Sequence, residues 1–563
     1  MHTIEATRRP DRRVVIIGGV AGGMSTAARL RRLDSHVEIV VIERSGHVSF
    51  ANCGLPYFVG GLIEEEDDLT LQTPEQLFDR FRLDVRVNTE VVQIDRSSHE
   101  VVLCSLPDGV QSRLGYDKLV LSTGAAPVRP AIPGYNRVRT MRTVEDAARL
   151  VSDLDVEPRT AVVIGAGFIG LEMAENLVAK GIEVTLVEAS TQVLPPLGEE
   201  LAILVYDELV ARGVHVHVGT AVKSIGPRTV TLSDGRLLDA DLVVGAIGVR
   251  PDVVLAQDAG LTLGARGGIT VNDSNQSSDV DIYAVGDAVE KPDAISGAST
   301  LIALANIANR QGRRVADHLA GIDVKATPSI GTAIVKVFDV VAATTGWNER
   351  QLSAAARPYK AIHSHPFDHA TYYPGATRMS MKLLFEPDTG AILGAQIVGR
   401  NGVDKRIDVL ATAMAGGISA GHLADLELAY APPFSSAKDP VNLLGYMAEN
   451  VLSGACDVVP PDELEALSKG GWTVLDVRAA NEYLLGSIPS SLHVPLDQLR
   501  DRLDELPETP IVVYCEVGQR GHTATALLRE LGMTARNLDG GYRTWMAQRR
   551  AAALATTSAQ RAT

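Results

Sequence analysis

Two copies of one strand–turn–helix–strand pattern constrain the fold of this chain more than any other feature. The first copy runs from RVVIIGG at residue 13 through GGMSTAARLRRL to EIVVIER, and the second is TAVVIGAGFIGLEMAENLVAKGIEVTLVEAS, from residue 160. Strands that alternate with helices in this way build parallel sheets. A chain of 563 residues is also too long for one hydrophobic core. We therefore expect each copy to form its own α/β nucleotide-binding domain.

The second copy carries a complete G-x-G-x-x-G motif directly after its first strand, at Gly165, Gly167 and Gly170. The first glycine of such a motif makes the turn, the second lets the backbone approach a pyrophosphate, and the third lets the helix pack on the strand. Glu188 closes the next strand, where its carboxylate can accept from a ribose 2′-hydroxyl and would repel a 2′-phosphate. This copy is predicted to bind NADH in preference to NADPH.

The first copy is less regular, because Val20 stands where the second glycine would be, between Gly18 and Gly23. Glu43, at the end of IVVIER, supplies the acid that is expected after the second strand of a dinucleotide-binding unit. The pattern therefore favours a second dinucleotide site in the same chain.

A later strand, SSDVDIYAVGDAVE, ends in Gly286 and Asp287. With the two glycine loops it resembles the pyridine nucleotide-disulfide oxidoreductases, whose FAD domain ends in such a pair, and LSTGAAP (121–127) resembles their crossover strand. The resemblance implies FAD in the first unit, NADH in the second, and hydride flow from nicotinamide to flavin. The FAD-binding residues that it implies are Gly18, Gly23, Glu43, Arg44, Thr123, Gly124, Gly286 and Asp287.

Cys53 lies in the segment SFANCGLPY, and none of the five residues that follow it is a cysteine. The C-x4-C disulfide of the two-cysteine family members is therefore excluded, so Cys53 must work as a mixed disulfide with a small thiol or as a sulfenic acid. Relatives that use a sulfenic acid carry a histidine in the first glycine loop, where this chain has Ala21. The segment instead resembles the coenzyme A-disulfide reductases, in which the cysteine alternates between a thiolate and a coenzyme A mixed disulfide.

This resemblance implies a coenzyme A site and an active site shared between two subunits. Arg29 and Arg32 lie on one face of the helix after the first glycine loop, where they could bind phosphates or form a solvated basic face. In the family, two tyrosines of the partner subunit approach the cysteine; the matching positions are Tyr372 and Tyr430, in TYYPGA and YAPPFSSAKDPVN. A homodimer is thus expected. The implied coenzyme A contacts are Ser25, Arg29, Arg32, Ser49, Asn52, Tyr373 and Lys438.

Near the C-terminus, VVYCEVGQRGHTATALLRELG places Cys515 at the end of a buried strand, with Arg520 five positions on and a helix following. Backbone N–H groups and a helix N-terminus around the sulfur favour a thiolate. The loop resembles the C-x-x-G-x-R active loop of rhodaneses, and Asp476 and Arg478 match their Asp-x-Arg segment. Its length favours a persulfide on Cys515, although Gly521 replaces the usual Ser or Thr.

The predicted fold class is α/β, with FAD and NAD Rossmann-like domains, an α+β dimerisation domain and a C-terminal rhodanese-like α/β domain. The expected boundaries are 13–150 and 266–330 for the FAD domain, 151–265 for the NAD(P)H domain, 331–452 for the dimerisation domain and 460–550 for the rhodanese domain. The tail from Ala551 is predicted to be disordered.

Composition limits the partners and the compartment. A formal charge of −16 argues against nucleic-acid binding, and no apolar run is long enough to cross a membrane. Four widely separated cysteines fit a reducing cytoplasm, and no motif surrounds Cys104 or Cys456. We predict no metal site.

Together these features predict an enzyme: an FAD-dependent NADH reductase of coenzyme A persulfide, polysulfide or coenzyme A disulfide, working through Cys53 and coupled to a sulfur carrier at Cys515. Two alternatives stay open. One is a water-forming NADH oxidase, which shares the FAD, NADH and single-cysteine plan. The other is a rhodanese sulfurtransferase with a redox-sensing flavin unit.

Overall fold

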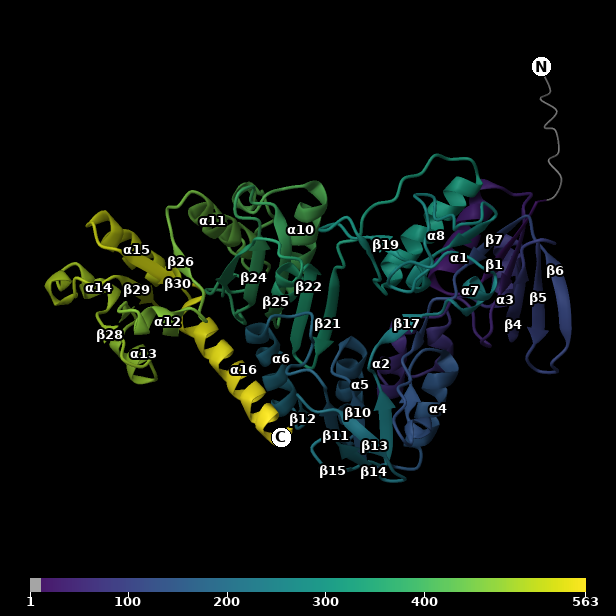
Figure 1. The fold of residues 1–563 in the computed structure, drawn as a ribbon, viewed down its shortest axis with the longest axis horizontal. Coiled ribbons are helices and arrows are strands. Elements are labelled where there is room, and N and C mark those ends of the chain that lie inside the picture. Colours follow the sequence, from purple (N-terminus) through teal and green to yellow (C-terminus); the bar gives the residue numbers. More distant parts are fainter. Residues whose placement is uncertain (1–11, 563) are drawn as a thin grey trace, which may run out of the picture.

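The computed structural model describes residues 12–562 as four packed units. Three of them lie in a row and the fourth, in blue, lies below (Figure 1). We call them the first Rossmann unit (purple and teal, right), the second Rossmann unit (blue), the antiparallel unit (green) and the C-terminal unit (yellow-green, left).

The first Rossmann unit is a parallel five-stranded sheet in the order β18-β7-β1-β2-β3. Its central strand is buried on both faces: Val14 and Ile16 pack into one hydrophobic cluster, Val15 and Ile17 into another. This explains why the strand is a continuous apolar run. Its elements are β1 (Arg13–Ile17), α1 (Ala21–Leu33), β2 (Glu38–Ile42), β3 (Asp84–Arg86), β7 (Lys118–Leu121), β18 (Ile282–Ala284) and α8 (Ala305–Leu319), with α1 packed on α8.

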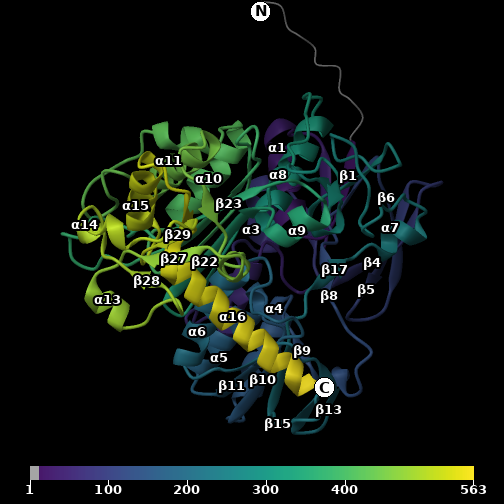
Figure 2. The ribbon, with the colours of Figure 1, turned by 60° about the vertical axis from the view of Figure 1, so that its left-hand side comes forward.

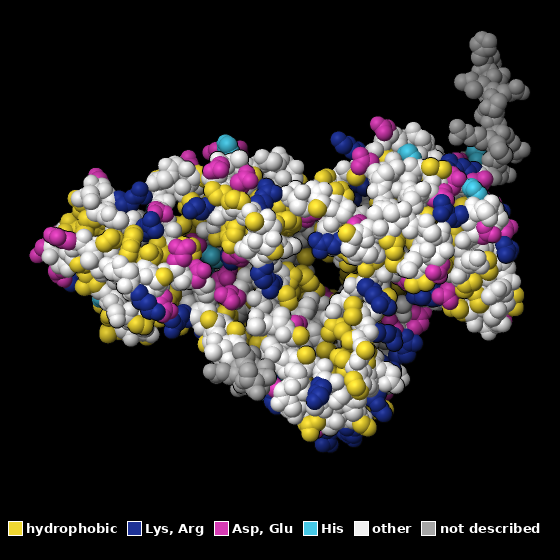
Figure 3. Space-filling view, viewed as in Figure 1, with side chains coloured by type: hydrophobic (Ala, Val, Ile, Leu, Met, Phe, Trp, Pro, Cys, Tyr) yellow, Lys and Arg dark blue, Asp and Glu magenta, His cyan; other side chains and the backbone are white. Residues whose placement is uncertain are grey.

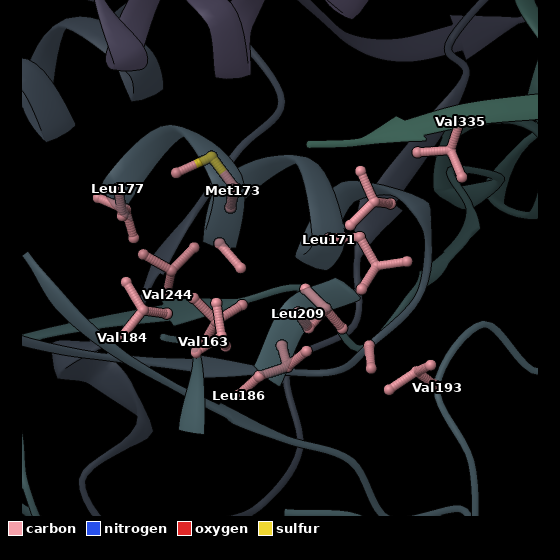
Figure 4. Packing of buried hydrophobic residues seen from close by; sticks show 14 of the residues in the cluster. Val163, Leu171, Met173, Leu177, Val184, Leu186, Val193, Leu209, Val244 and Val335 are labelled. Atoms are coloured by element: carbon pink, nitrogen blue, oxygen red, sulfur yellow. The ribbon is translucent and has the colours of Figure 1, made fainter. Parts of the chain in front are cut away.

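The second Rossmann unit repeats this plan in the order β12-β11-β10-β16-β9. Figure 4 shows its core, where Val163, Leu186 and Val244 from three strands meet Leu171 and other side chains of one helix. The sheet includes β9 (Arg139–Thr140), which precedes the boundary expected at residue 150. Its other elements are β10 (Thr160–Ile164), α5 (Phe168–Ala179), β11 (Glu183–Val187), α6 (Glu199–Ala211), β12 (His215–His217) and β16 (Leu242–Gly245).

The antiparallel unit is a five-stranded sheet in the order β21-β22-β25-β24-β23. Two helices cover one face, where Met381 and Leu383 pack, while the alternate residue Lys382 points to the opposite side and is also buried. The elements are β21 (Ala333–Val337), β22 (Val340–Gly346), β23 (Lys360–Ser364), β24 (Ser380–Phe385), β25 (Ile392–Gly399), α10 (Val403–Gly416) and α11 (Pro440–Leu452).

The C-terminal unit is a parallel sheet in the order β26-β30-β29-β27-β28. Its strands are β26 (Val458–Val459), β27 (Thr473–Asp476), β28 (Leu492–His493), β29 (Ile511–Tyr514) and β30 (Ala535–Leu538), and its main helices are α15 (Gln519–Glu530) and α16 (Gly541–Ala562). The two parallel Rossmann sheets, the antiparallel sheet and this parallel sheet confirm the predicted fold class.

The long helix α16 leaves the C-terminal unit and packs along α6 of the second Rossmann unit (Figures 1 and 2). The prediction of a disordered tail from Ala551 is therefore wrong, because the helix continues to Ala562 and Ala551 is buried. Along the part of the chain that the structure describes, no helix combines the length and the apolar character that crossing a membrane requires.

Candidate active sites

The two glycine loops have the same geometry although their sequences differ. Gly18 and Gly165 both adopt φ +102°, a conformation that favours glycine. Each donates its N–H at 2.8 Å to the last residue of the neighbouring strand, Ile42 or Val187. The third glycines, Gly23 and Gly170, sit so close to the first that a Cβ there would overlap its carbonyl oxygen. Each helix therefore packs directly on its strand, as the motif predicts.

The acids that close the second strands repeat this correspondence. Glu43 accepts from Gly19 N at 2.7 Å and from Ser45 N at 2.8 Å, and Glu188 accepts from Ala166 N and Ser190 N, both at 2.8 Å. Each carboxylate thus braces its own glycine loop at the place where a dinucleotide ribose would lie.

Val20 fits the first loop because the loop requires no left-handed backbone there. It precedes α1 with φ −114°, and its counterpart Gly167 precedes α5 with φ −81°. A Cβ at Gly167 would meet no atom within 4 Å. The second loop is therefore open at the position where a pyrophosphate would approach.

One continuous cavity of about 2460 Å³ joins the two loops. Single ligand pockets measure roughly 300–1,000 Å³, so this cavity has room for more than one ligand. Figure 3 shows an opening where the Rossmann units and the antiparallel unit meet. The predicted residues that line the cavity are Gly18, Glu43, Arg44, Asn52, Cys53, Thr123, Gly124, Gly165, Gly167, Glu188, Gly286 and Asp287.

Cys53 is a free, solvent-exposed thiol in the wall of this cavity. It lies in a short turn, Asn52–Gly54, that leads into α2 (Leu55–Gly60). Ser49 holds the segment under the first glycine loop: its backbone is left-handed, with φ 52°, and its N–H donates to Gly19 O at 2.7 Å. Among the described residues, the Asn52 Oδ1 atom is buried without a hydrogen-bond partner, as expected of a group that meets a ligand.

Two cavity residues that the sequence analysis did not identify act on this thiol. Although Cys53 is exposed to solvent, its partial burial in the cavity wall raises the thiol pKa, the Glu172 carboxylate raises it further, and the Arg142 guanidinium opposes both. Burial also raises the pKa of Glu172 to about 7. The phenol of Tyr57 donates to Glu172 at 3.5 Å. The sequence does contain one indication of this position. Glu172 follows Phe168 by four residues, so the two side chains lie on one face of α5, and in the structure both line the cavity.

The side chains of the predicted phosphate-binding helix, α1, contact different neighbours. Ser25 donates to Asn309 at 2.9 Å and Arg29 pairs with Asp317 at 2.7 Å, so both face α8, whereas Arg32 lies 5.2 Å from the ring of Phe81. Arg29 and Arg32 thus have different neighbours. Within one described chain, neither lines the cavity of Cys53, to which α8 contributes Asn309 and Arg310.

The predicted tyrosine pair is formed, but away from Cys53. The hydroxyls of Tyr372 and Tyr430 are 2.6 Å apart, this hydrogen bond raises the pKa of Tyr372, and the side chains are 74% and 47% exposed. Tyr373 is also exposed, and Lys438 Nζ lies 5.9 Å from the ring of Tyr446. Among the described residues, none of these lines the cavity of Cys53.

A buried guanidinium joins the two segments that carry the tyrosines. Arg406, which is 1% exposed, donates to Asp368 O at 2.9 Å and to Ser435 Oγ at 3.1 Å, and it pairs with Asp439 at 3.0 Å. Arg406 therefore fixes the two segments that present the tyrosine pair to one another.

In the C-terminal unit, Cys515 is fully buried at the end of β29, next to the start of α15. Arg520 donates two hydrogen bonds of 2.6 Å to Glu482, which raise the pKa of the guanidinium, and the charge and a hydrogen bond of Cys515 act in the same direction. The first N–H groups of α15 have no acceptor within the helix, so they are available near the sulfur. The arrangement suits an anionic sulfur.

The surrounding residues explain two features of this loop. Arg478, which is 2% exposed, pairs with Asp476 and also with Glu516, the residue after Cys515, at 3.5 Å, so the Asp-x-Arg segment contacts the loop. A side chain at Gly521 would overlap Asn537, which explains the missing Ser or Thr. No group of His, Cys, Asp and Glu in residues 12–562 is arranged to hold a metal ion.

Family models match nearly the whole described chain. The pyridine nucleotide-disulphide oxidoreductase model matches residues 12–312, its dimerisation domain 332–440 and the rhodanese-like domain 460–548. These matches confirm the predicted fold class, with its nucleotide-binding, dimerisation and rhodanese-like parts.

Solved structures share the complete domain set. Reduced Bacillus anthracis CoADR-RHD is 45% identical with a TM-score of 0.94, covering 96% of this chain and 98% of that one. A NAD-dependent persulfide reductase from A. fulgidus is 37% identical with a TM-score of 0.89, covering 95% and 100%.

Two curated relatives each match 78% of the chain. An NADH oxidase of Methanocaldococcus jannaschii is 36% identical over 78% of this chain and 99% of its own length. A coenzyme A disulfide reductase of Staphylococcus haemolyticus is 33% identical over 78% and 100%. This chain belongs to the pyridine nucleotide-disulphide oxidoreductases, flavin-dependent enzymes that use FAD and a nicotinamide cofactor, and it carries a rhodanese-like domain at its C-terminal end.

Proposed function

We propose that this enzyme uses NADH to reduce a coenzyme A persulfide, a polysulfide or coenzyme A disulfide at Cys53. The observation that carries the proposal is an exposed thiol in the wall of a cavity that joins both dinucleotide loops. The described chain contains four free cysteines, and the other three lie outside the cavity lining. A second sulfur for Cys53 must therefore arrive on the substrate.

The chemistry balances for a persulfide. The Cys53 thiolate attacks the sulfur that is bonded to coenzyme A, hydrosulfide leaves, and Cys53 becomes a mixed disulfide with coenzyme A. Bound FAD would accept hydride from NADH and supply the two electrons that cleave this mixed disulfide. One NADH and one proton thus convert one persulfide into one thiol and one hydrogen sulfide.

The proposed coenzyme A site is completed by a second subunit. The hydroxyls of Tyr372 and Tyr430 form an exposed pair on the antiparallel unit, and the exposed rings of Tyr373 and Phe434 lie on the same segments. Exposed aromatic groups of this kind are typical of interfaces. In a homodimer the pair would approach the partner's cysteine, where a phenol can protonate a leaving thiolate. Ser25, Arg29, Arg32, Ser49, Asn52 and Lys438 remain the proposed coenzyme A contacts.

Cys515 would carry sulfane sulfur as a persulfide, either onto coenzyme A or toward Cys53. The buried Cys515 beside Arg520 supports this role. Four free cysteines also fit a reducing cytoplasm as the working compartment.

The test is stopped-flow reduction with coenzyme A persulfide, comparing the wild type with Cys53→Ser. We expect NADH to reduce the flavin in both proteins and sulfide release to require Cys53. Mass spectrometry of the purified wild type should show a coenzyme A adduct on Cys53 that the variant lacks. Full sulfide release by Cys53→Ser would refute the mechanism.

The similarity to an NADH oxidase makes water formation the second candidate. Rapid four-electron reduction of oxygen, with slow turnover on every disulfide and persulfide, would favour it. Against it, Ala21 lines the cavity where peroxide-reducing relatives are expected to carry a histidine. Sulfurtransferase activity without NADH consumption would instead favour the rhodanese alternative.

A further inference from the structure

Four charged or titratable side chains are buried where the second Rossmann unit, the antiparallel unit and the C-terminal unit meet. They are Glu200 of α6, His363 of β23, Lys382 of β24 and Asp539, two residues before α16, and each is at most 7% exposed. Such side chains are buried only when they are paired. The cluster lies outside the lining of the Cys53 cavity, so the reductase chemistry leaves it unexplained.

His363 bridges two carboxylates of different units. Its backbone N–H donates to Asp539 at 2.8 Å, its ring Nδ1 contacts the other Asp539 oxygen at 2.6 Å, and its Nε2 contacts Glu200 at 3.2 Å. Lys382 pairs with the same Glu200 oxygen at 2.8 Å and also with Glu349. Both ring nitrogens therefore face carboxylates, which is the setting of an imidazolium.

The pKa values of the two neighbouring histidines agree with this geometry. Burial alone would lower the pKa of His363, but Asp539 and Glu200 outweigh it and raise the pKa to about 9. The neighbouring His365 has a pKa well below its usual range because of burial and nearby cations, and it contacts Thr544 of α16 at 2.7 Å. One charged and one neutral histidine thus hold the start of the C-terminal helix.

The same short segment holds the loop of Cys515. Tyr542 N donates to Cys515 O at 2.8 Å, and Arg543 N donates to Glu516 O at 3.0 Å. Only Gly540 and Gly541 separate Asp539 from Tyr542, and Gly541 is packed so tightly that a Cβ there would lie 2.7 Å from Gly518 N. A displacement of Asp539 is therefore expected to shift the backbone that holds the Cys515 loop.

We infer that His363 is a positioning residue for the C-terminal unit: the bridge from Asp539 through His363 to Glu200 holds the Cys515 loop in the closed geometry required for sulfur transfer. This inference rests on the proposed sulfur-carrier role of Cys515. It assigns a function in the C-terminal unit to a side chain of the antiparallel unit, and it leaves the reduction at Cys53 independent of the bridge.

The test compares His363→Gln and Asp539→Asn with Arg550→Ala in the FAD-loaded full chain. Arg550 pairs with Asp207 at 2.7 Å across the same contact of α16 with α6, but its side chain is 52% exposed, so it is the matched control. Iodoacetamide labelling, resolved by peptide mass spectrometry, reports opening of the loop because Cys515 is fully buried. Cys456, also buried and in the same region, reports general loosening.

We expect each bridge variant to label Cys515 at least tenfold faster, with Cys456 unchanged, and to lower kcat for thiosulfate sulfurtransfer more than it changes KM. NADH-driven reduction of coenzyme A disulfide should stay within twofold of the wild type, as should every rate in Arg550→Ala. The inference would be overturned if both bridge variants labelled Cys515 at the wild-type rate. It would also be overturned if labelling of Cys456 accelerated as much as labelling of Cys515, or if Arg550→Ala accelerated labelling of Cys515 as much as the bridge variants do. If the wild type lacks sulfurtransferase activity, the carrier role fails, whereas labelling still decides whether the bridge controls the loop.

Discussion

Gly167→Ala and Gly170→Ala should separate the two functions of the second glycine loop. At Gly167, φ is −81° and a Cβ would meet no atom within 4 Å, so the protein itself accommodates alanine. Such a replacement stabilises by about 0.4–1 kcal/mol through the unfolded state. The new methyl group would, however, occupy the path of the pyrophosphate. We expect the Kd for NADH to rise at least about tenfold, or 1.4 kcal/mol.

At Gly170 the same change acts on the fold. A Cβ there would lie 3.0 Å from the Gly165 carbonyl carbon and closer still to its oxygen, so α5 must move away from β10. Overpacking of this kind costs about 1–3 kcal/mol, which corresponds to a fall in Tm of roughly 2–10 °C.

The assays are thermal unfolding and anaerobic stopped-flow reduction of the flavin at increasing NADH concentrations. The FAD content of each variant is the control, because the first loop is untouched. An unchanged Kd for NADH in Gly167→Ala would refute the claim that a methyl group obstructs the pyrophosphate in this loop, since Val20 stands at the equivalent position of the first loop. A Gly170→Ala protein that is as stable as the wild type would refute the packing argument.

Three further predictions address the other sites. Mixed dimers of Cys53→Ser and Tyr372→Phe subunits should recover activity that neither parent homodimer has, because one of their two sites is intact; no recovery would contradict a shared site. Glu172→Gln should speed alkylation of Cys53 above pH 7, where the Glu172 carboxylate is charged and raises the thiol pKa, and leave the rate unchanged near pH 5; equal rates at both pH values would count against this coupling. Glu482→Gln should lower sulfurtransferase kcat severalfold by weakening the partly exposed ion pair that orients Arg520, a pair worth up to about 1 kcal/mol; wild-type turnover would show that this pair does not orient the arginine.

The parts of the fold that the sequence predicted are those with strong local signals. The two glycine loops are recognisable because each needs particular residues at the turn, the helix start and the strand end. The strand Arg139–Thr140 has only two residues and no periodicity, and it joins the second sheet through contacts far along the chain. The helix beyond Ala551 looks like a polar tail in sequence, but it is ordered by packing on α6, some 340 residues earlier.

The site divides in the same way. Cys53 and Cys515 stand in local motifs, whereas Glu172 and Arg142 reach the Cys53 cavity only because the two Rossmann units close on each other. The basic helix shows the limit of spacing arguments: Arg29 and Arg32 share a face by periodicity, yet Asp317 and Phe81 draw their long side chains to different neighbours. No local motif predicts the role of His363, since its partners Asp539 and Glu200 come from two other units.

The isolation of Cys53 also has a consequence for electron counting. A subunit whose Cys53 carries a mixed disulfide should accept four electrons, two at bound FAD and two at the disulfide. The second pair expels a small thiol, and within residues 12–562 no other cysteine lines the cavity to restore the disulfide. After reduction, desalting and reoxidation, the same subunit should accept only two electrons, until an external disulfide recharges it. The number of electrons that the enzyme accepts therefore reports whether Cys53 carries a small thiol at that moment.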